Sequence, residues 1–380
     1  MSSSPFASRS VRAVFPPLIV HLCLLISIWV FYSLSGGESP PGNWHAYKHW
    51  PPDAETPGWL SPLANWDPSH YLHLAQSGYT PDNPSNAFYP LWPLILRIGL
   101  TGGVADIVAG SLLATVLSFL AVVALHELSE ARFGRPTADR VGWLIYSAPC
   151  AHVFNVPYSE SLCLLLLVGV FWFWDRGQLI LACTLAFLVS LARPVGAFIV
   201  PALFVEGWFG AHRAKPLSKA LPLFPVLGYG TYLAMMYLST GNAFDGIQAQ
   251  KFYANHPSLG NAVDLSGLAD SLILTKWDLE STHSILDRVM FVLVLVTLPM
   301  VWRIRPSWFW WVIAAAIIPA ATNWFLSFRR FELLLFPVFV AWARWFEMGN
   351  SRWAWWYTLL LSFILQAVMT YRFLSFNWAG

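Results

Sequence analysis

Charged residues are scarce in this chain of 380 residues. Asp, Glu, Lys and Arg make up 11% of it, against about 25% in an average soluble domain, and 57% of the residues are hydrophobic. So few charges cannot cover a water-exposed surface, which excludes an ordinary soluble protein. No basic run is longer than two residues and the net charge is only +2, which excludes a nucleic-acid partner.

Cysteine is also sparse, with Cys23, Cys150, Cys163 and Cys183 as the full set. All four fall inside apolar runs, none of them in a CxxC pair or a long polar loop. Disulfide frameworks and cysteine metal sites need clustered cysteines at characteristic spacings. The sequence therefore predicts neither.

Tryptophan, by contrast, is abundant, with 22 residues. Many of them lie near the ends of apolar runs, where an amphipathic indole is stable at the level of the lipid headgroups. The first apolar run, about 11–34, follows Arg9 and Arg12 and is longer than the roughly 7–15 residues of a signal-peptide core. We interpret it as an uncleaved transmembrane helix.

Further apolar runs follow along the whole chain. Because a helix needs about 20 apolar residues to cross a bilayer, we predict about eleven transmembrane helices in an all-α, polytopic bundle. The predicted segments are 11–34, 105–128, 140–154, 158–174, 179–192, 195–208, 217–238, 285–302, 308–326, 333–346 and 353–373. The short pair 179–192 and 195–208 either crosses the bilayer or forms a tight hairpin within it. With no internal repeat, residues 1–380 are expected to form a single membrane domain.

The short connections carry most of the basic residues on the side of the N-terminus. By the positive-inside rule this side is cytoplasmic, so a multi-pass protein of the cell membrane is expected, or of the ER membrane in a eukaryote. Two long loops, about 35–86 and 239–284, then face the extracytoplasmic side. We expect the chemistry to be there.

The first long loop contains a short predicted helix with clear end signals. Asp67 suits the N-cap, Pro68 the first helical position and Gly78 the C-terminal stop. Its apolar residues Tyr71, Leu74 and Ala75 recur at helical spacing, which predicts a helix lying on the membrane surface. Asp67 is then either only a cap or a general base held near the lipid boundary.

Two histidines of this helix, His70 and His73, are three residues apart on one face. No third ligand follows at a suitable spacing, so we predict no metal site. The aromatic and proline run from Phe88 to Pro93 follows where the chain re-enters the bilayer. It is typical of a rigid interfacial turn.

Ionisable residues at the outer ends of the apolar runs are the next candidates, since charge at membrane depth is costly and usually functional. They are Glu160, Arg193, Arg329, Arg330 and Glu332. Carboxylates facing arginines suit a phosphate leaving group beside a hydroxyl that loses its proton. Structural interpretations remain open: Glu160 as partner of a helix N-terminus, and the Arg329–Arg330 pair as lipid-phosphate contacts. Arg193, between two apolar runs, is harder to explain structurally.

These motifs together resemble a known family. Trp66-Asp67, His70-Tyr71, Ala75 and Gly78-Tyr79, followed by Phe88-Tyr89-Pro90-Leu91-Trp92-Pro93, are similar to the first-loop signature of the PIG-V mannosyltransferases. Pro157 to Leu162 resembles the family's PY[ST]E[AS]L, and Ala192 to Gly196 resembles its AR-x2-G. Gly241 to Phe244 with Gln248 to Gln250, and Arg330-Phe331 with Phe336-Pro337, resemble later family motifs. The family's second-loop aspartate is Asn242 here, and its RY is Arg330-Phe331.

The resemblance implies a GT-C helix bundle with surface helices in the first outward loop. In eukaryotes the family adds the second mannose of the glycosylphosphatidylinositol precursor from dolichyl-phosphate mannose, and the compact chain is similar to a bacterial member. Asp67 matches the expected base for inverting attack. Arg193 and Arg330 are then candidates for the departing phosphate, with Arg329, Glu160, His70, Tyr71 and Gln250 as further donor or substrate contacts. A metal or other cofactor is not required, which agrees with the absence of a DxD motif in a Rossmann-like pattern.

The expected partners are a polyprenyl-phosphate sugar, a lipid or glycan acceptor and the membrane lipids. Two alternatives come from other classes. A polyprenyl-lipid transporter or flippase would also use intramembrane arginines, but the polar residues gather on one side and leave no polar trail across the bundle. A non-catalytic lipid-binding subunit would be expected to lack the base, and Asp67 is present.

Overall fold

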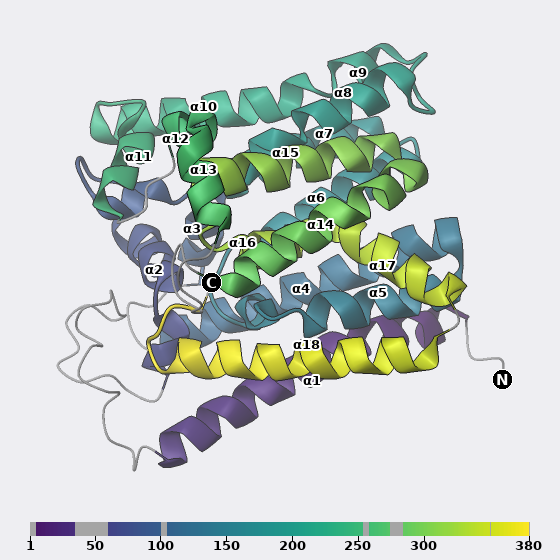
Figure 1. Cartoon of the computed structure of the whole chain (residues 1–380). Helices are drawn as coiled ribbons and strands as arrows, with labels where there is room; N and C mark the ends of the chain where they lie inside the picture. The colour runs from purple at the N-terminus through teal and green to yellow at the C-terminus, as the bar shows by residue number, and fades with distance from the viewer. Residues whose placement is uncertain are drawn as a thin grey trace.

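The protein is helical throughout the part of the chain that its computed structural model describes, which is residues 5–34, 60–99, 105–253, 258–273, 284–349 and 351–379. The predicted loop residues 35–59 and 274–283 lie outside the described residues. In Figure 1 the long helices run roughly side by side along one direction. The all-α bundle predicted from the sequence is therefore confirmed.

Each of the eleven predicted segments corresponds to a helix. They are α1 (Pro5–Leu34), α4 (Ala105–Phe133), α5 (Arg135–Ser147), α6 (Glu160–Asp175), α7 (Leu179–Ala192), α8 (Val200–Phe209), α10 (Leu223–Thr240), α14 (Ile285–Ile304), α15 (Pro306–Thr322), α17 (Phe336–Met348) and α18 (Arg352–Leu374). Four of them, α1, α4, α14 and α18, are long and apolar enough to cross a membrane. The others are shorter, because prolines and 3-10 turns such as η4 (Ala151–Asn155) interrupt the predicted segments.

The remaining helices are short, and most lie together. Figure 1 shows α2 (Asp67–Ser77), α3 (Leu91–Arg97), α11 (Asp245–Gln248), α12 (Leu259–Val263) and α13 (Leu265–Leu272) at one end of the bundle, which we call the loop end. The C-terminus lies near α2 at this end. The N-terminus and the connection from α8 to α9 (Pro216–Ala220) lie at the opposite end.

Apolar side chains cover the outside of the bundle as well as its core. Trp29 is 68% exposed, Leu238 83% and Val296 67%, and each belongs to a long helix. A soluble monomer rarely exposes apolar surface on this scale, whereas lipid solvates it without cost. The outer faces of the long helices are therefore suited to contact with acyl chains.

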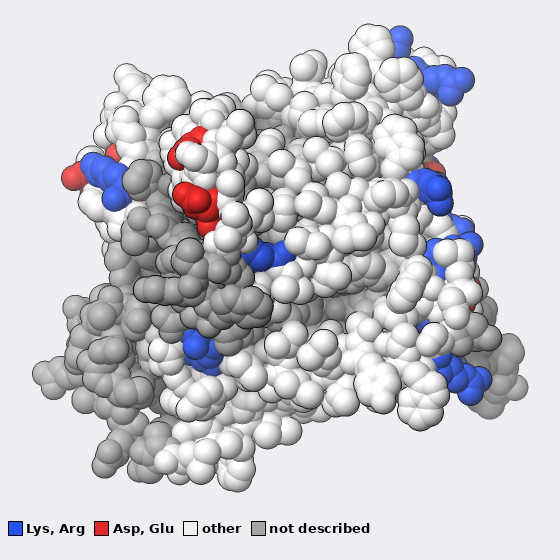
Figure 2. Space-filling view, in the orientation of Figure 1, with Lys and Arg blue, Asp and Glu red and all other residues white. Residues whose placement is uncertain are grey.

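Charge is concentrated at the two ends. Figure 2 shows Lys and Arg side chains along the right edge, at the end opposite the loop end, and a mainly uncharged surface between the ends. Acidic side chains gather over α12 and α13 at the loop end. This distribution matches the basic short connections expected from the sequence.

Candidate active site

Helix α2 begins one residue before its predicted start and ends where predicted, but its environment differs from the prediction. Pro68 lies in the first turn, and the N–H of Gly78, at φ 74°, closes the helix on the Leu74 carbonyl. The predicted surface position is wrong, because Tyr71, Leu74 and Ala75 are all buried. The helix packs against α3, η2 (Ser61–Ala64) and η3 (Pro84–Ala87). Its apolar face is thus covered by protein.

The structure does not place Asp67 at the N-cap, and its role as a general base stays a prediction. The N-cap is Trp66, at φ 61°, whose side chain makes no capping bond, and Asp67 is the first residue of the helix. A non-glycine residue at such an angle costs of order 1–3 kcal/mol and is typical of functional sites. The carboxylate of Asp67 points across to α16 (Phe328–Phe331) instead, where its Oδ2 lies 2.7 Å from Nη1 of Arg330.

Arg330 connects Asp67 to two further predicted residues. Its Nε lies 3.3 Å from Oε1 of Glu160, and the same oxygen lies 2.6 Å from Nη1 of Arg193. Two carboxylates and two guanidinium groups from four separate parts of the chain thus form one network. Glu160, Arg193 and Arg330 are each at most 7% exposed, so these charges are stable only because they are paired.

Burial alone would lower the pKa of Arg330, but the negative charges of Asp67 and Glu160 oppose it and the net effect is a raised pKa. The guanidinium is therefore a permanent cation. Glu160 does not line the cavity described below, and its position between two arginines makes it a positioning residue.

Arg193 owes its orientation to the residue that follows it. Pro194 disfavours helical geometry at the preceding residue, and Arg193 ends α7 in an extended conformation at φ −157° and ψ 153°. Its Nη1 donates to the Ser159 hydroxyl at 3.0 Å, and that hydroxyl lies 2.7 Å from the Tyr71 hydroxyl. Burial, above all, raises the pKa of Tyr71, so its hydroxyl stays protonated.

The structure explains why the last position of the AR-x2-G pattern, Gly196, is a glycine. Gly196 lies in the tight turn η5 (Pro194–Ile199), where an added Cβ would overlap the carbonyl of Val189 in α7. We expect Gly196→Ala to lower stability by roughly 1–3 kcal/mol, because overpacking forces the backbone apart, and to displace Arg193. A thermal unfolding scan in detergent measures the effect.

Gly230 provides the control for this change. It lies in α10, where an added Cβ has no neighbour within 4 Å. Gly230→Ala should leave the melting temperature unchanged or raise it, since alanine is favoured over glycine by about 1 kcal/mol inside a helix. Equal loss in both variants would contradict the role given to the close turn.

A cavity of about 260 Å³ opens beside this network at the loop end. Of the predicted site residues, it is lined by Asp67, Tyr71, Arg193, Gln250 and Arg330. Aromatic side chains form much of the remaining wall, namely Phe88, Tyr89, Tyr253, Phe331 and Trp378. One carboxylate and two guanidinium groups therefore face a mainly apolar space, in which electrostatic interactions are stronger than in water.

His70 lies behind this wall. Its Nδ1 is 2.9 Å from the Ser85 hydroxyl, and its ring stacks on Phe88 with centroids 4.5 Å apart. His70 therefore does not line the cavity, and it packs on Phe88, which does. Within the part of the chain that the structure describes, no group of three or more His, Cys, Asp or Glu side chains has the spacing of a metal site.

Arg329 is not brought to the cavity. Consecutive residues of a helix point about 100° apart, so Arg329 and Arg330 cannot face the same side. The side chain of Arg329 is fully buried, with Nη1 at 3.5 Å from Oδ2 of Asp287 and 2.5 Å from the Ser284 hydroxyl.

The second long loop reaches the same site. Asp245, in α11, accepts from Nδ2 of Asn86 at 2.6 Å, and Lys251 pairs with Asp82 at 2.7 Å. These contacts fix the second loop on the first and bring Gln250 to the cavity. Asn242 has a local role, since its Oδ1 accepts from the N–H of Phe244 at 3.0 Å.

Some residues of the site were not foreseen from the sequence. Tyr253 and Trp378 line the cavity but follow no recognisable motif. Ser159, which contacts Arg193, is inside a motif but gives no local sign of this contact. Trp378 lies beyond the last predicted segment, so only the tertiary fold reveals it. An aromatic residue outside an apolar run carries no periodic signal.

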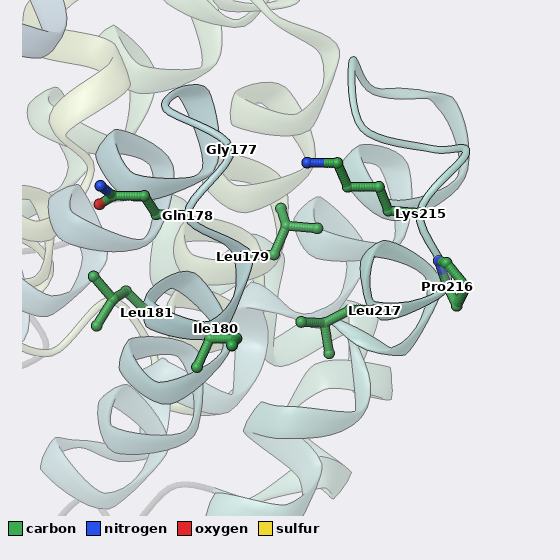
Figure 3. A pocket seen from close by; sticks show the side chains of 8 residues that line it. All are labelled: Gly177, Gln178, Leu179, Ile180, Leu181, Lys215, Pro216 and Leu217. Atoms are coloured by element: carbon green, nitrogen blue, oxygen red, sulfur yellow. The ribbon is translucent and has the colours of Figure 1, made fainter.

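A second pocket, of about 530 Å³, lies at the opposite end of the bundle (Figure 3). It is formed by residues 177–181 and 215–217, and Figure 3 shows leucine and isoleucine side chains below the amine of Lys215. No carboxylate is present among the residues that line it. It lacks a carboxylate that could accept a proton in transfer chemistry, whereas the loop-end cavity has Asp67.

Comparison with known proteins points to the same region. Residues 53–200 match the sequence model of the family described as Mannosyltransferase (PIG-V), a stretch that contains Asp67, Tyr71, Glu160 and Arg193. GPI alpha-1,6-mannosyltransferase 2 of Cricetulus griseus is 29% identical over 182 residues, covering 43% of this chain and 37% of the relative. The protein of that name from Rattus norvegicus is 32% identical over 130 residues (31% and 26%), and that from Homo sapiens 32% over 134 residues (32% and 27%).

These alignments span 26% to 37% of the length of the relatives. No solved structure matches the chain.

Proposed function

We propose, from the match of residues 53–200 to the PIG-V mannosyltransferase family, that the protein is a membrane-embedded, inverting mannosyltransferase. Its donor is a polyprenyl-phosphate-linked mannose and its acceptor a hydroxyl of a lipid or glycan. One observation carries the proposal: Asp67, Arg193 and Arg330 line a single cavity. A proton acceptor and two phosphate-binding cations are thus within one small space.

In the proposed reaction, Asp67 takes the proton of the acceptor hydroxyl as its oxygen attacks the anomeric carbon of mannose. The bond between that carbon and the phosphate oxygen breaks, and the electron pair leaves with the polyprenyl phosphate. General-base assistance of this kind contributes roughly 10²–10⁴ in rate. Attack opposite to the leaving group inverts the anomeric configuration.

The charge balance of the network supports a place for the donor phosphate. The formal charges of the network sum to zero, because Asp67 and Glu160 are balanced by Arg193 and Arg330. The site without substrate therefore holds no excess of either charge. A phosphate that pairs with Arg193 and Arg330 competes with Asp67 for Arg330. Donor binding would in this way release the carboxylate for its work as base, and charge-assisted bonds would stabilise the developing phosphate charge.

The test is mannosyl transfer by the purified protein in detergent, from radiolabelled polyprenyl-phosphate mannose to a panel of alkyl glycosides and lipid acceptors. Transfer that depends on the phosphate-linked donor, with inversion at the anomeric carbon, is the expected result. Retention of configuration would rule out the single-displacement mechanism. Donor binding without transfer to any acceptor would rule out the enzyme assignment and favour a lipid-binding or transport role.

We further propose a bundle of about eleven transmembrane segments, with the N-terminus cytoplasmic and the loop end extracytoplasmic. The basic edge in Figure 2 supports this orientation. Asp82→Cys at the loop end should react with a membrane-impermeant maleimide added to intact cells. Arg213→Cys, in the α8–α9 connection, should react only after permeabilisation. The reverse pattern would contradict the orientation.

A further inference from the structure

The residues after α18 turn back towards the cavity. The N–H of Asn377 donates to the carbonyl of Arg372 at 2.9 Å, and Phe376, at φ 59°, is 1% exposed. A bulky residue at positive φ is unfavourable, and it persists only where the surroundings hold it in place. The conformation of residues 375–379 is therefore defined by tertiary contacts.

Three side chains hold this segment by its carbonyl groups. Nε of Arg372 donates to the carbonyl of Trp378 at 3.1 Å. The carbonyl of Ala379 accepts from Nε of Arg329 at 3.3 Å and from Sγ of Cys150 at 3.1 Å. Arg329, although absent from the cavity, thus fastens a segment that reaches it. Side chains from the middle and the end of the chain thus bind the segment 375–379.

Trp378 is the residue that these contacts place at the cavity. It forms part of the wall together with Asp67, and its ring packs edge-on against Trp66 with centroids 4.9 Å apart. Trp66 immediately precedes Asp67 and has the unusual φ angle described above. The indole of Trp378 is therefore linked through a single residue to the general base of the proposed reaction.

An indole next to a carboxylate suits a particular substrate group. Pyranose rings present an apolar face of C–H groups, which packs on an aromatic surface, and hydroxyl groups at the edge, which hydrogen-bond to carboxylates. The phosphate of the donor belongs with Arg193 and Arg330. The group beside Asp67 is by contrast the acceptor, because Asp67 takes its proton.

We propose that Trp378 forms the subsite for the sugar ring of the acceptor, which makes the acceptor a glycoside and not a simple lipid alcohol. This inference rests on the proposed function. It assigns a substrate contact to Trp378, the residue of the 375–379 segment that lines the cavity.

Steady-state kinetics separate acceptor binding from donor binding. The assay uses polyprenyl-phosphate mannose as donor and, as acceptor, whichever of octyl mannoside, octyl glucoside or octyl galactoside the unmodified protein uses best. Trp378→Ala should raise the KM for the octyl glycoside by about 10-fold or more and leave the donor KM within about twofold. Trp378→Phe, which keeps an aromatic face, should lie between. Asn377→Ala, next to it with an exposed side chain, should match the unmodified protein.

The outcomes distinguish the two proposals. An unchanged acceptor KM in a folded Trp378→Ala protein, or equal rises in acceptor and donor KM, contradicts the proposed subsite but not the mannosyltransferase assignment. Transfer to octanol at the rate of the best glycoside also contradicts the subsite. If the unmodified protein transfers to no acceptor, the proposed function and the subsite fail together.

Discussion

Asp67→Asn is expected to lower kcat for mannosyl transfer by about 100-fold or more, since a general base contributes roughly 10²–10⁴ in rate. Asparagine keeps the shape of the side chain and an oxygen that accepts from Arg330. A hydrogen bond to a neutral amide therefore replaces the one to the carboxylate at 2.7 Å. Asparagine cannot take the acceptor proton. The donor KM should change less than kcat, and single-turnover transfer of labelled mannose measures the chemical step directly.

Asp175→Asn is the matched control for this variant. Asp175 pairs with Arg305 at 3.0 Å and with Arg132 at 3.0 Å, at the end of the bundle opposite the cavity. The side chains of Asp67 and Asp175 are 16% and 25% exposed, so the two substitutions remove a charge from similar surroundings. Asp175→Asn should transfer mannose at nearly the native rate. Full activity in a folded Asp67→Asn protein would show that another group is the base.

The sequence was sufficient to predict the helices and most of the candidate site, because local signals determine both. Apolar runs predicted all eleven long helices, although prolines shorten several of them to less than the thickness of a bilayer. Pro68 and Pro194 impose backbone geometry on their neighbours, so the start of α2 was predicted to within one residue and the break after α7 was predicted. Asp67, Glu160, Arg193 and Arg330 were then placed on one side by topology alone.

The errors arose where partners distant in sequence decide the outcome. The apolar face of α2 predicts a helix on a surface, and only the fold shows that α3 and η3 cover that face. Arg329 and Arg330 are adjacent in sequence but pair with different carboxylates, Asp287 and Asp67. Trp378 reaches the cavity through contacts with Arg372 and Trp66, and no local pattern encodes these.

Arg330→Lys is expected to lower kcat/KM for the donor by about 100-fold, which corresponds to about 2.7 kcal/mol of transition-state stabilisation. The guanidinium contacts Asp67 through Nη1 and Glu160 through Nε, and the planar fork leaves further N–H groups for a phosphate. A lysine keeps the charge, which protects the fold, but a single ammonium cannot reach both carboxylates and the phosphate in the same geometry. The donor KM should rise and kcat should fall, each by about 10-fold.

Arg305→Lys tests whether such a loss is specific to the cavity. Arg305 is 6% exposed and Arg330 is 7%, and Arg305 also bridges two carboxylates, those of Glu206 and Asp175, at the far end of the bundle. Its replacement should lower the melting temperature to a similar degree without changing the donor KM. If both variants lose transfer equally, the effect of Arg330 is on stability. If Arg330→Lys keeps the native donor KM, Arg193 alone holds the phosphate, and Arg330 only positions Asp67.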